Sequence, residues 1–174
     1  PGATGLAALP VPFTLLGLTS EQLFPVQHVT LLSWALLVLL PSWRGTHRLA
    51  YAGPVVCAAV HLAMVVHQLR HPVPGLTVDF SSLRGVTALV QRPDGVLASW
   101  LHHSAFDPLV GLGEVLDAQR ARVPHLLVVP CLLLTALLGP PGFLAYFAAR
   151  WSWVAWSTQL PRKGSLWGLL SRRG

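Results

Sequence analysis

Long uncharged stretches of apolar residues alternate along the chain with short polar or basic loops. The stretch from Gln22 to Leu40 carries no charge. As a helix it would be about 28 Å long, close to the thickness of a hydrocarbon core. Similar stretches occupy residues 49–69, residues 96–116 and the region that begins at Val123. This pattern predicts an all-α integral membrane protein with four transmembrane helices.

Prolines and glycines separate the predicted spans. Pro41 ends the first span, and a cluster of breakers beginning at Pro72 ends the second. In the connection that follows, Leu83, Val86 and Val90 recur at helical spacing, which predicts a short interfacial helix between the second and third spans. The run 139–142, Gly-Pro-Pro-Gly, is expected to break or bend the fourth helix near its end.

The two ends of the chain differ from the middle. Residues 1–18 are apolar but interrupted by proline and glycine, and we expect an extended N-terminal arm. Residues 19–150 form the predicted membrane domain, and residues 151–174 form a C-terminal tail of tryptophans and basic residues. Such a tail suits a membrane surface or a partner protein. The chain begins at Pro1 without a methionine, so we expect a segment upstream, most simply a cleaved targeting peptide.

Composition supports a membrane class. The chain is 53% hydrophobic and only 10% charged, with a mean hydropathy of +0.57. Its net charge of +6 comes from basic residues in the loops and tail, which favours lipid contact over nucleic-acid binding. In a four-span topology, eight of the twelve lysines and arginines lie on the side of both termini. This bias predicts that both termini face the compartment of synthesis or import.

An acidic residue lies in the middle of the third predicted span. Placing Asp107 there costs about 2.5–3.5 kcal/mol on insertion scales, so it needs a partner. His103 lies four residues earlier and Trp100 another three, on one helical face, while Pro108 disfavours helical geometry at Asp107. An acid beside His102 and His103 is suited to proton transfer. The alternative is a buried polar pair that only fixes helix register.

Other polar residues suggest less specific roles. Histidines such as His61 most simply donate hydrogen bonds between helices, although axial ligation of haem or of a chlorophyll magnesium stays open. Glu114 and Asp117, followed by Arg120 and Arg122, indicate an interfacial ion-pair cluster. The two cysteines lie in separate apolar segments and indicate packing, not a metal site. No nucleotide-binding motif occurs, so we expect chemistry without a required cofactor.

Several strings of residues resemble a known family in order and spacing. They are LTSEQLFPVQHVTLLSWALLVLLPSW, SSLRGVTALV, SWLHHSAFDPLVG and VPHLLVVPCLLLTALLGPPGFLAY, which together cover about residues 19–150. The chain resembles the family of four-helix membrane proteins that includes the plastid abscisic-acid-deficient, or neoxanthin-synthase-like, proteins and their bacterial relatives.

The resemblance implies a protein of a plastid membrane, thylakoid or inner envelope, with both termini stromal, that is needed to convert violaxanthin to neoxanthin. This isomerisation protonates an epoxide oxygen while a proton leaves the neighbouring polyene carbon, which yields an allene. The matching positions imply Asp107 as the acid and His102 as the base, with His103 beside them in the catalytic group. Trp100, Phe106 and His125 would contact the carotenoid, and His125 is a second candidate donor.

Some positions differ from the family pattern. His28 stands where Asn is usual, His103 where Tyr is usual and Pro108 where Leu is usual, while Leu112-Gly113 replaces an Arg-Trp pair. These differences support a second hypothesis, a non-catalytic accessory or pigment-holding subunit of a photosystem or light-harvesting complex. Such a subunit would dock through its tail and hold a carotenoid, chlorophyll or lipid.

Overall fold

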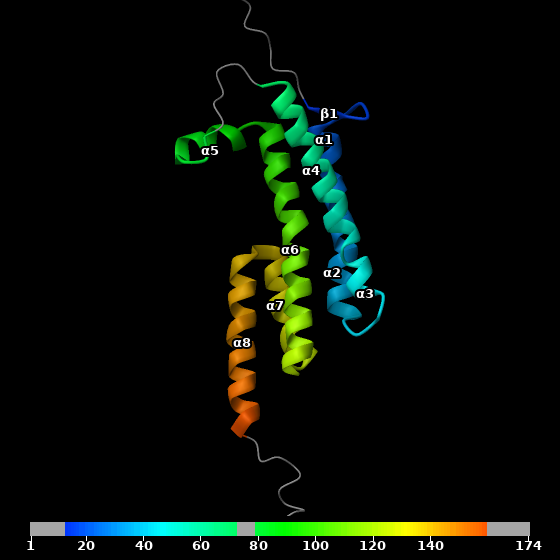
Figure 1. Cartoon of the computed structure of the whole chain (residues 1–174), viewed down its shortest axis with the longest axis vertical. Helices are drawn as coiled ribbons and strands as arrows, with labels where there is room; N and C mark the ends of the chain where they lie inside the picture. The colour runs from blue at the N-terminus through cyan, green and yellow to red at the C-terminus, as the bar shows by residue number, and fades with distance from the viewer. Residues whose placement is uncertain (1–12, 73–78, 160–174) are drawn as a thin grey trace, which may run out of the picture. The chain divides into compact units, whose positions relative to one another are not determined.

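The computed structural model of the chain describes residues 13–72 and 79–159. Most of these residues are helical (Figure 1). Residues 1–12 of the predicted arm, and residues 160–174 of the predicted tail, lie outside the described residues. The described end of the arm is a small hairpin, in which β1 (Thr14–Leu15) pairs antiparallel with β2 (Leu18–Thr19). Its turn places Leu16 at φ 54° and Gly17 at φ 80°.

The chain divides into two compact units, residues 1–109 and 110–174, and each is described separately. The first unit contains most of the helices and the first part of α6. Its elements are α1 (Ser20–Leu23), the 3-10 helix η1 (Phe24–Val29), α2 (Thr30–Leu39), α3 (Thr46–Leu49), α4 (Ala52–Arg70), α5 (Leu83–Val90) and α6 (Pro93–Ala121), which continues into the second unit.

Two segments of the first unit are long and apolar enough to cross a membrane. They are Ser20–Leu39 and Thr46–Arg70, and they contain the first two predicted spans. The first is not a regular α-helix throughout, because η1 interrupts it with Pro25 near its start. Gly53 lets α4 approach α2 closely, since a Cβ at this position would lie 2.8 Å from the Cα of Thr30.

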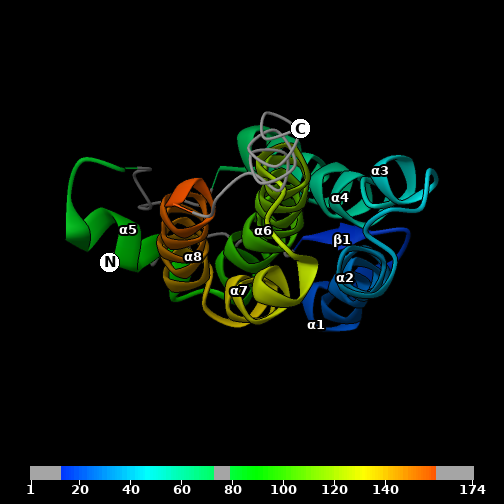
Figure 2. The ribbon, with the colours of Figure 1, turned by 90° about the horizontal axis from the view of Figure 1, so that it is seen from below.

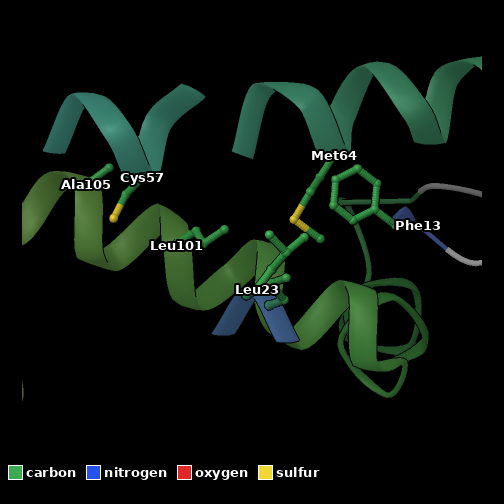
Figure 3. Packing of buried hydrophobic residues seen from close by; sticks show 7 residues of the cluster. Phe13, Leu23, Cys57, Met64, Leu101 and Ala105 are labelled. Carbon is green, nitrogen blue, oxygen red and sulfur yellow. The ribbon is translucent and has the colours of Figure 1, made fainter. Parts of the chain in front are cut away.

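The apolar core of the first unit joins α1, α4 and α6 (Figure 3). Leu23 of α1 packs with Cys57 and Met64 of α4 and with Leu101 of α6, and Phe13 adds its ring from the strand end of the arm. Cys57 is fully buried and unoxidised, which confirms the packing role expected for it. The core therefore fixes the registers of α4 and α6 against each other.

The predicted short helix in the long connection is present as α5. Ser82 is its N-cap, and the hydroxyl of Ser82 accepts a hydrogen bond from the backbone N–H of Gly85 at 3.1 Å. The side chains of Leu83, Val86 and Val90 are exposed. Its place at a membrane interface stays a prediction.

The second unit contains the end of α6, α7 (His125–Leu138) and α8 (Pro140–Gln159). The expectation that the fourth span breaks near its end is wrong in position, because Gly139 adopts φ 64° and two separate helices follow one another. They pack side by side (Figures 1 and 2). With 14 residues, α7 is about 21 Å long, which is short of a hydrocarbon core. Helix α8 continues past residue 150, where the sequence suggested that the tail begins.

Candidate functional site

The first unit encloses a cavity of about 600 Å³ between α4, α5 and the first part of α6. This volume lies within the range of small-molecule sites, about 300–1,000 Å³. Most of its lining is apolar, with Met64 and Val65 from α4 and Val86, Leu89 and Val90 from α5. Polar side chains line it at two levels along α4 and α6. The cavity is therefore suited to an apolar molecule with polar groups.

Three histidines line one level of the cavity. His61 comes from α4, and its Nδ1 donates a hydrogen bond to the carbonyl of Ala98 in α6 at 3.0 Å. This bond confirms the interhelical donor role expected for such histidines. The ring of His102 lies 5.7 Å from that of His61 and 5.9 Å from that of His103. The result is a group of imidazoles at the cavity wall.

Asp107 lies one helical turn after His103. Both His103 and His102 are close enough to interact electrostatically with its carboxylate, which is half-buried. Among the described residues, none forms a hydrogen bond or ion pair with this carboxylate, and Asp107 is not one of the cavity-lining residues. His103 thus touches the cavity while lying near the carboxylate. Helix α6 continues through Pro108, which is buried.

Trp100 and Phe106 lie near the histidines but do not line the cavity. The indole of Trp100 donates a hydrogen bond to the side-chain amide oxygen of Gln27, and its ring lies 6.0 Å from that of Phe24. Phe106 is 55% exposed and its ring lies 4.8 Å from that of His102. His125 begins α7, in the second unit, and is also absent from the cavity lining.

The sequence analysis missed the other polar level of the cavity. Its side chains come from His67 and Gln68 near the end of α4 and from Arg92 and Asp94 at the start of α6. Asp94 is already occupied, since it accepts hydrogen bonds from the hydroxyl of Ser20 at 2.5 Å and from the backbone N–H of Phe13 at 3.4 Å.

The Nε2 atom of His67 is buried and has no hydrogen-bond partner among the described residues. One sequence signal points to this level, the spacing of His61 and Gln68 at i and i+7 on one face of α4. That signal has meaning only once α6 is known to face the same side.

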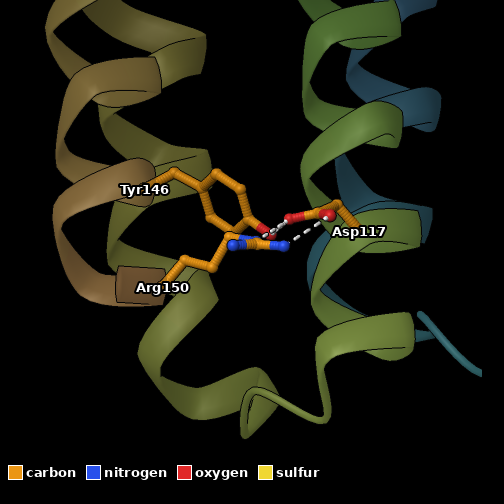
Figure 4. A network of polar contacts seen from close by, with 3 residues as sticks. All are labelled: Asp117, Tyr146 and Arg150. Atoms are coloured by element: carbon orange, nitrogen blue, oxygen red, sulfur yellow. Dashed lines mark hydrogen bonds and ion pairs between the residues drawn. The ribbon is translucent and has the colours of Figure 1, made fainter. Parts of the chain in front are cut away.

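The second unit holds the two other acidic residues of α6, and the expected ion-pair cluster within that helix is wrong. Glu114 is 2% exposed, and its Oε1 accepts a hydrogen bond from the hydroxyl of Thr135 in α7 at 2.9 Å. Asp117 instead binds α8, where the hydroxyl of Tyr146 donates to its Oδ2 at 2.6 Å and Arg150 forms an ion pair with it (Figure 4). These contacts join three helices.

Among residues 13–72 and 79–159, no group of three or more His, Cys, Asp or Glu side chains is arranged to hold a metal ion. The chemistry that the first unit offers is therefore that of imidazoles and a carboxyl group beside an apolar cavity.

A protein-family model described as ABA4-like, ABA DEFICIENT 4-like, matches residues 22–146. Comparisons with curated proteins and with solved structures gave no match. The matched range contains every residue that lines the cavity except Phe13. Because it covers well over half of the chain, the protein belongs to the ABA4-like family, whose members are membrane proteins related to xanthophylls and abscisic acid.

Proposed function

We propose that this protein is a membrane-embedded, neoxanthin-synthase-like enzyme that binds violaxanthin in the cavity of the first unit and isomerises its epoxide to an allene. The observation that carries the proposal is the cavity itself. It is largely apolar, and its wall holds His102 and His103 within one helical turn of Asp107. A polyene end ring needs an apolar site, and its epoxide needs an acid and a base.

The proposed reaction moves two protons and needs no other reactant. His102 lines the cavity and accepts the proton that leaves the polyene carbon next to the epoxide. The proton of Asp107 reaches the epoxide oxygen through His103, which lines the cavity where Asp107 does not. The C–O bond of the epoxide breaks as the C–H electrons form the allene, and the oxygen becomes a hydroxyl. One proton enters the substrate and one leaves it, so the product is an isomer.

The proposal includes a plastid membrane and four crossings. The first two are the apolar segments that end at Leu39 and Arg70. Helix α6 is the proposed third crossing, and the α7–α8 hairpin takes the place of a single fourth helix. Both termini are proposed to be stromal, as the distribution of basic residues suggests.

The test is conversion of violaxanthin by the purified full chain in liposomes, with the allenic product measured by chromatography. We expect His102→Phe to lower the rate by about 100-fold or more, since it removes the base but keeps an aromatic ring beside Phe106. His28→Phe is the matched control, because His28 is exposed on η1 and does not line the cavity.

Full activity in the His102→Phe variant would contradict the proposed base. Binding of violaxanthin at a one-to-one ratio without any conversion by the wild-type chain would support the second candidate, a non-catalytic pigment-holding subunit. One observation favours that candidate, namely that the Asp107 carboxylate does not line the cavity. Its partner would be a pigment-protein complex, and stoichiometric co-purification would test it.

A further inference from the structure

The cavity has polar side chains at two levels, and only one of them is used in the proposed reaction. The unused level contains His67, Gln68 and Arg92, which all line the cavity. On α4, His67 is six residues from His61, so the two levels are about 9 Å apart along the helix. This distance is on the scale of one substituted end ring with its first polyene bonds.

His67 carries the strongest indication that a ligand belongs here. A polar atom that is buried without a hydrogen bond costs about 1–3 kcal/mol, and native structures rarely leave one unpaired. The Nε2 of His67 is such an atom among the described residues, and the ring lines an apolar cavity. The ring itself is held in place, because Phe13 packs edge-on against it at 5.3 Å and His71 lies 4.8 Å away. A ligand polar group would satisfy the unpaired nitrogen.

Arg92 and Gln68 add donors at the same level. A guanidinium has five N–H donors, and Arg92 has one ionic contact in the described part of the chain, to Asp94 at 3.9 Å. That distance is too long for a hydrogen bond. Asp94 is occupied by Ser20 and Phe13, so it holds the start of α6 against the arm and leaves Arg92 available to a ligand.

We propose that His67, with Gln68 and Arg92, forms a subsite that binds the ring hydroxyl of a hydroxylated carotenoid and thereby selects xanthophylls over carotenes. This inference rests on the proposed function, since it assumes that a carotenoid occupies the cavity. The hydroxyl donates to or accepts from Nε2 of His67 and accepts from the neighbouring amide or guanidinium. The apolar ring fills the middle of the cavity, and the reacting carbons lie at the level of His102.

Binding, not turnover, tests the subsite. The full chain in lipid nanodiscs is titrated with zeaxanthin, which has a hydroxyl on each end ring and no epoxide, and with β-carotene, which has neither. We expect the wild-type chain to bind zeaxanthin about tenfold more tightly, the effect of one or two hydrogen bonds to otherwise unpaired groups. His67→Phe should reduce the preference to near unity while leaving β-carotene binding unchanged.

His71→Phe is the matched control, because it makes the same substitution four residues away at an exposed position that does not line the cavity. It should keep the preference. Gln68→Leu provides a second variant if His67→Phe lowers the thermal midpoint, and it should also weaken zeaxanthin binding selectively.

Equal wild-type affinities for the two pigments, or a His67→Phe variant that keeps the full preference, would overturn the subsite and leave the proposed function standing. A wild-type chain that binds neither pigment would overturn both.

Discussion

Helix α6 carries two aspartates ten residues apart, and the two units treat them differently. In the second unit, Asp117 accepts hydrogen bonds from Tyr146 and pairs with Arg150. In the first unit, Asp107 has only electrostatic neighbours, His103 and His102. Partners offset the cost of withdrawing a carboxylate from water, and a carboxylate without them is retained mainly where it has another use. The comparison indicates a structural role for Asp117 and a chemical role for Asp107.

The same contrast holds for the spaces around these groups. The first unit surrounds its imidazoles with a cavity, and the Nε2 of His67 has no partner among the described residues. In the second unit, α7 and α8 pack so closely that Gly142 has no room for a side chain. We therefore expect changes in the second unit to alter stability and changes at the cavity to alter ligand binding and conversion.

The largest effect on stability is expected at Gly142. A Cβ on this residue would lie 2.0 Å from the backbone nitrogen of Thr135, which cannot move without disturbing α7. Gly142→Ala should cost about 3 kcal/mol or more, seen as a large drop in the thermal midpoint. Gly113→Ala is the control, since a Cβ there meets nothing within 4 Å. It should stabilise α6 by about 0.5–1 kcal/mol. Equal midpoints for the two variants would refute tight packing of the hairpin.

A smaller effect is expected at Tyr146. Tyr146→Phe removes the hydroxyl that donates to Asp117 at 2.6 Å and leaves the Arg150 ion pair in place. We expect a loss of about 1 kcal/mol, measured by thermal unfolding, with zeaxanthin binding unchanged. The chain's other tyrosine gives a matched control, because Tyr51 is 46% exposed and Tyr51→Phe should leave the midpoint unaltered. Altered pigment binding in Tyr146→Phe would break the contrast between the units.

The smallest effect concerns the cap of α5. Hydrogen bonds from the hydroxyls of Ser81 and Ser82 hold the pKa of Asp79 down, from 3.8 to about 2. A lowered pKa means that the carboxylate stabilises the cap fully above pH 3.8 and that this is lost as the pH falls through about 2. Amide exchange in α5 should therefore quicken in acid across that window. Asp79→Asn should remove this pH dependence, whereas Glu21→Gln should retain it.

Much of the helical arrangement follows from the sequence because apolar length and breakers are local signals. The spans that end near Leu39 and Arg70, the cap at Ser82 and the burial of Cys57 follow from local pattern. The hairpin at Gly139 does not, because a Gly-Pro cluster bends or reverses a helix equally well and packing against Thr135 decides the outcome.

The candidate site was predictable only in part. His102, His103 and Asp107 are adjacent in sequence, and an acid within an apolar stretch is conspicuous. His67 and Arg92 belong to separate segments, and only the packing of α4 against α6 brings both to one cavity. Glu114 and Asp117 were misinterpreted for the same reason, since their partners come from α7 and α8 and not from the arginines that follow them in the chain.

One comparison tests the central claim most directly, the conversion of violaxanthin in liposomes by Asp107→Asn and by Asp117→Asn. Both variants replace a carboxylate with an amide on the same helix. We expect Asp107→Asn to lower the rate of allene formation by about 100-fold or more while keeping the wild-type thermal midpoint. Asp117→Asn should lower the midpoint and keep the rate per folded molecule. Full conversion by Asp107→Asn would contradict the account.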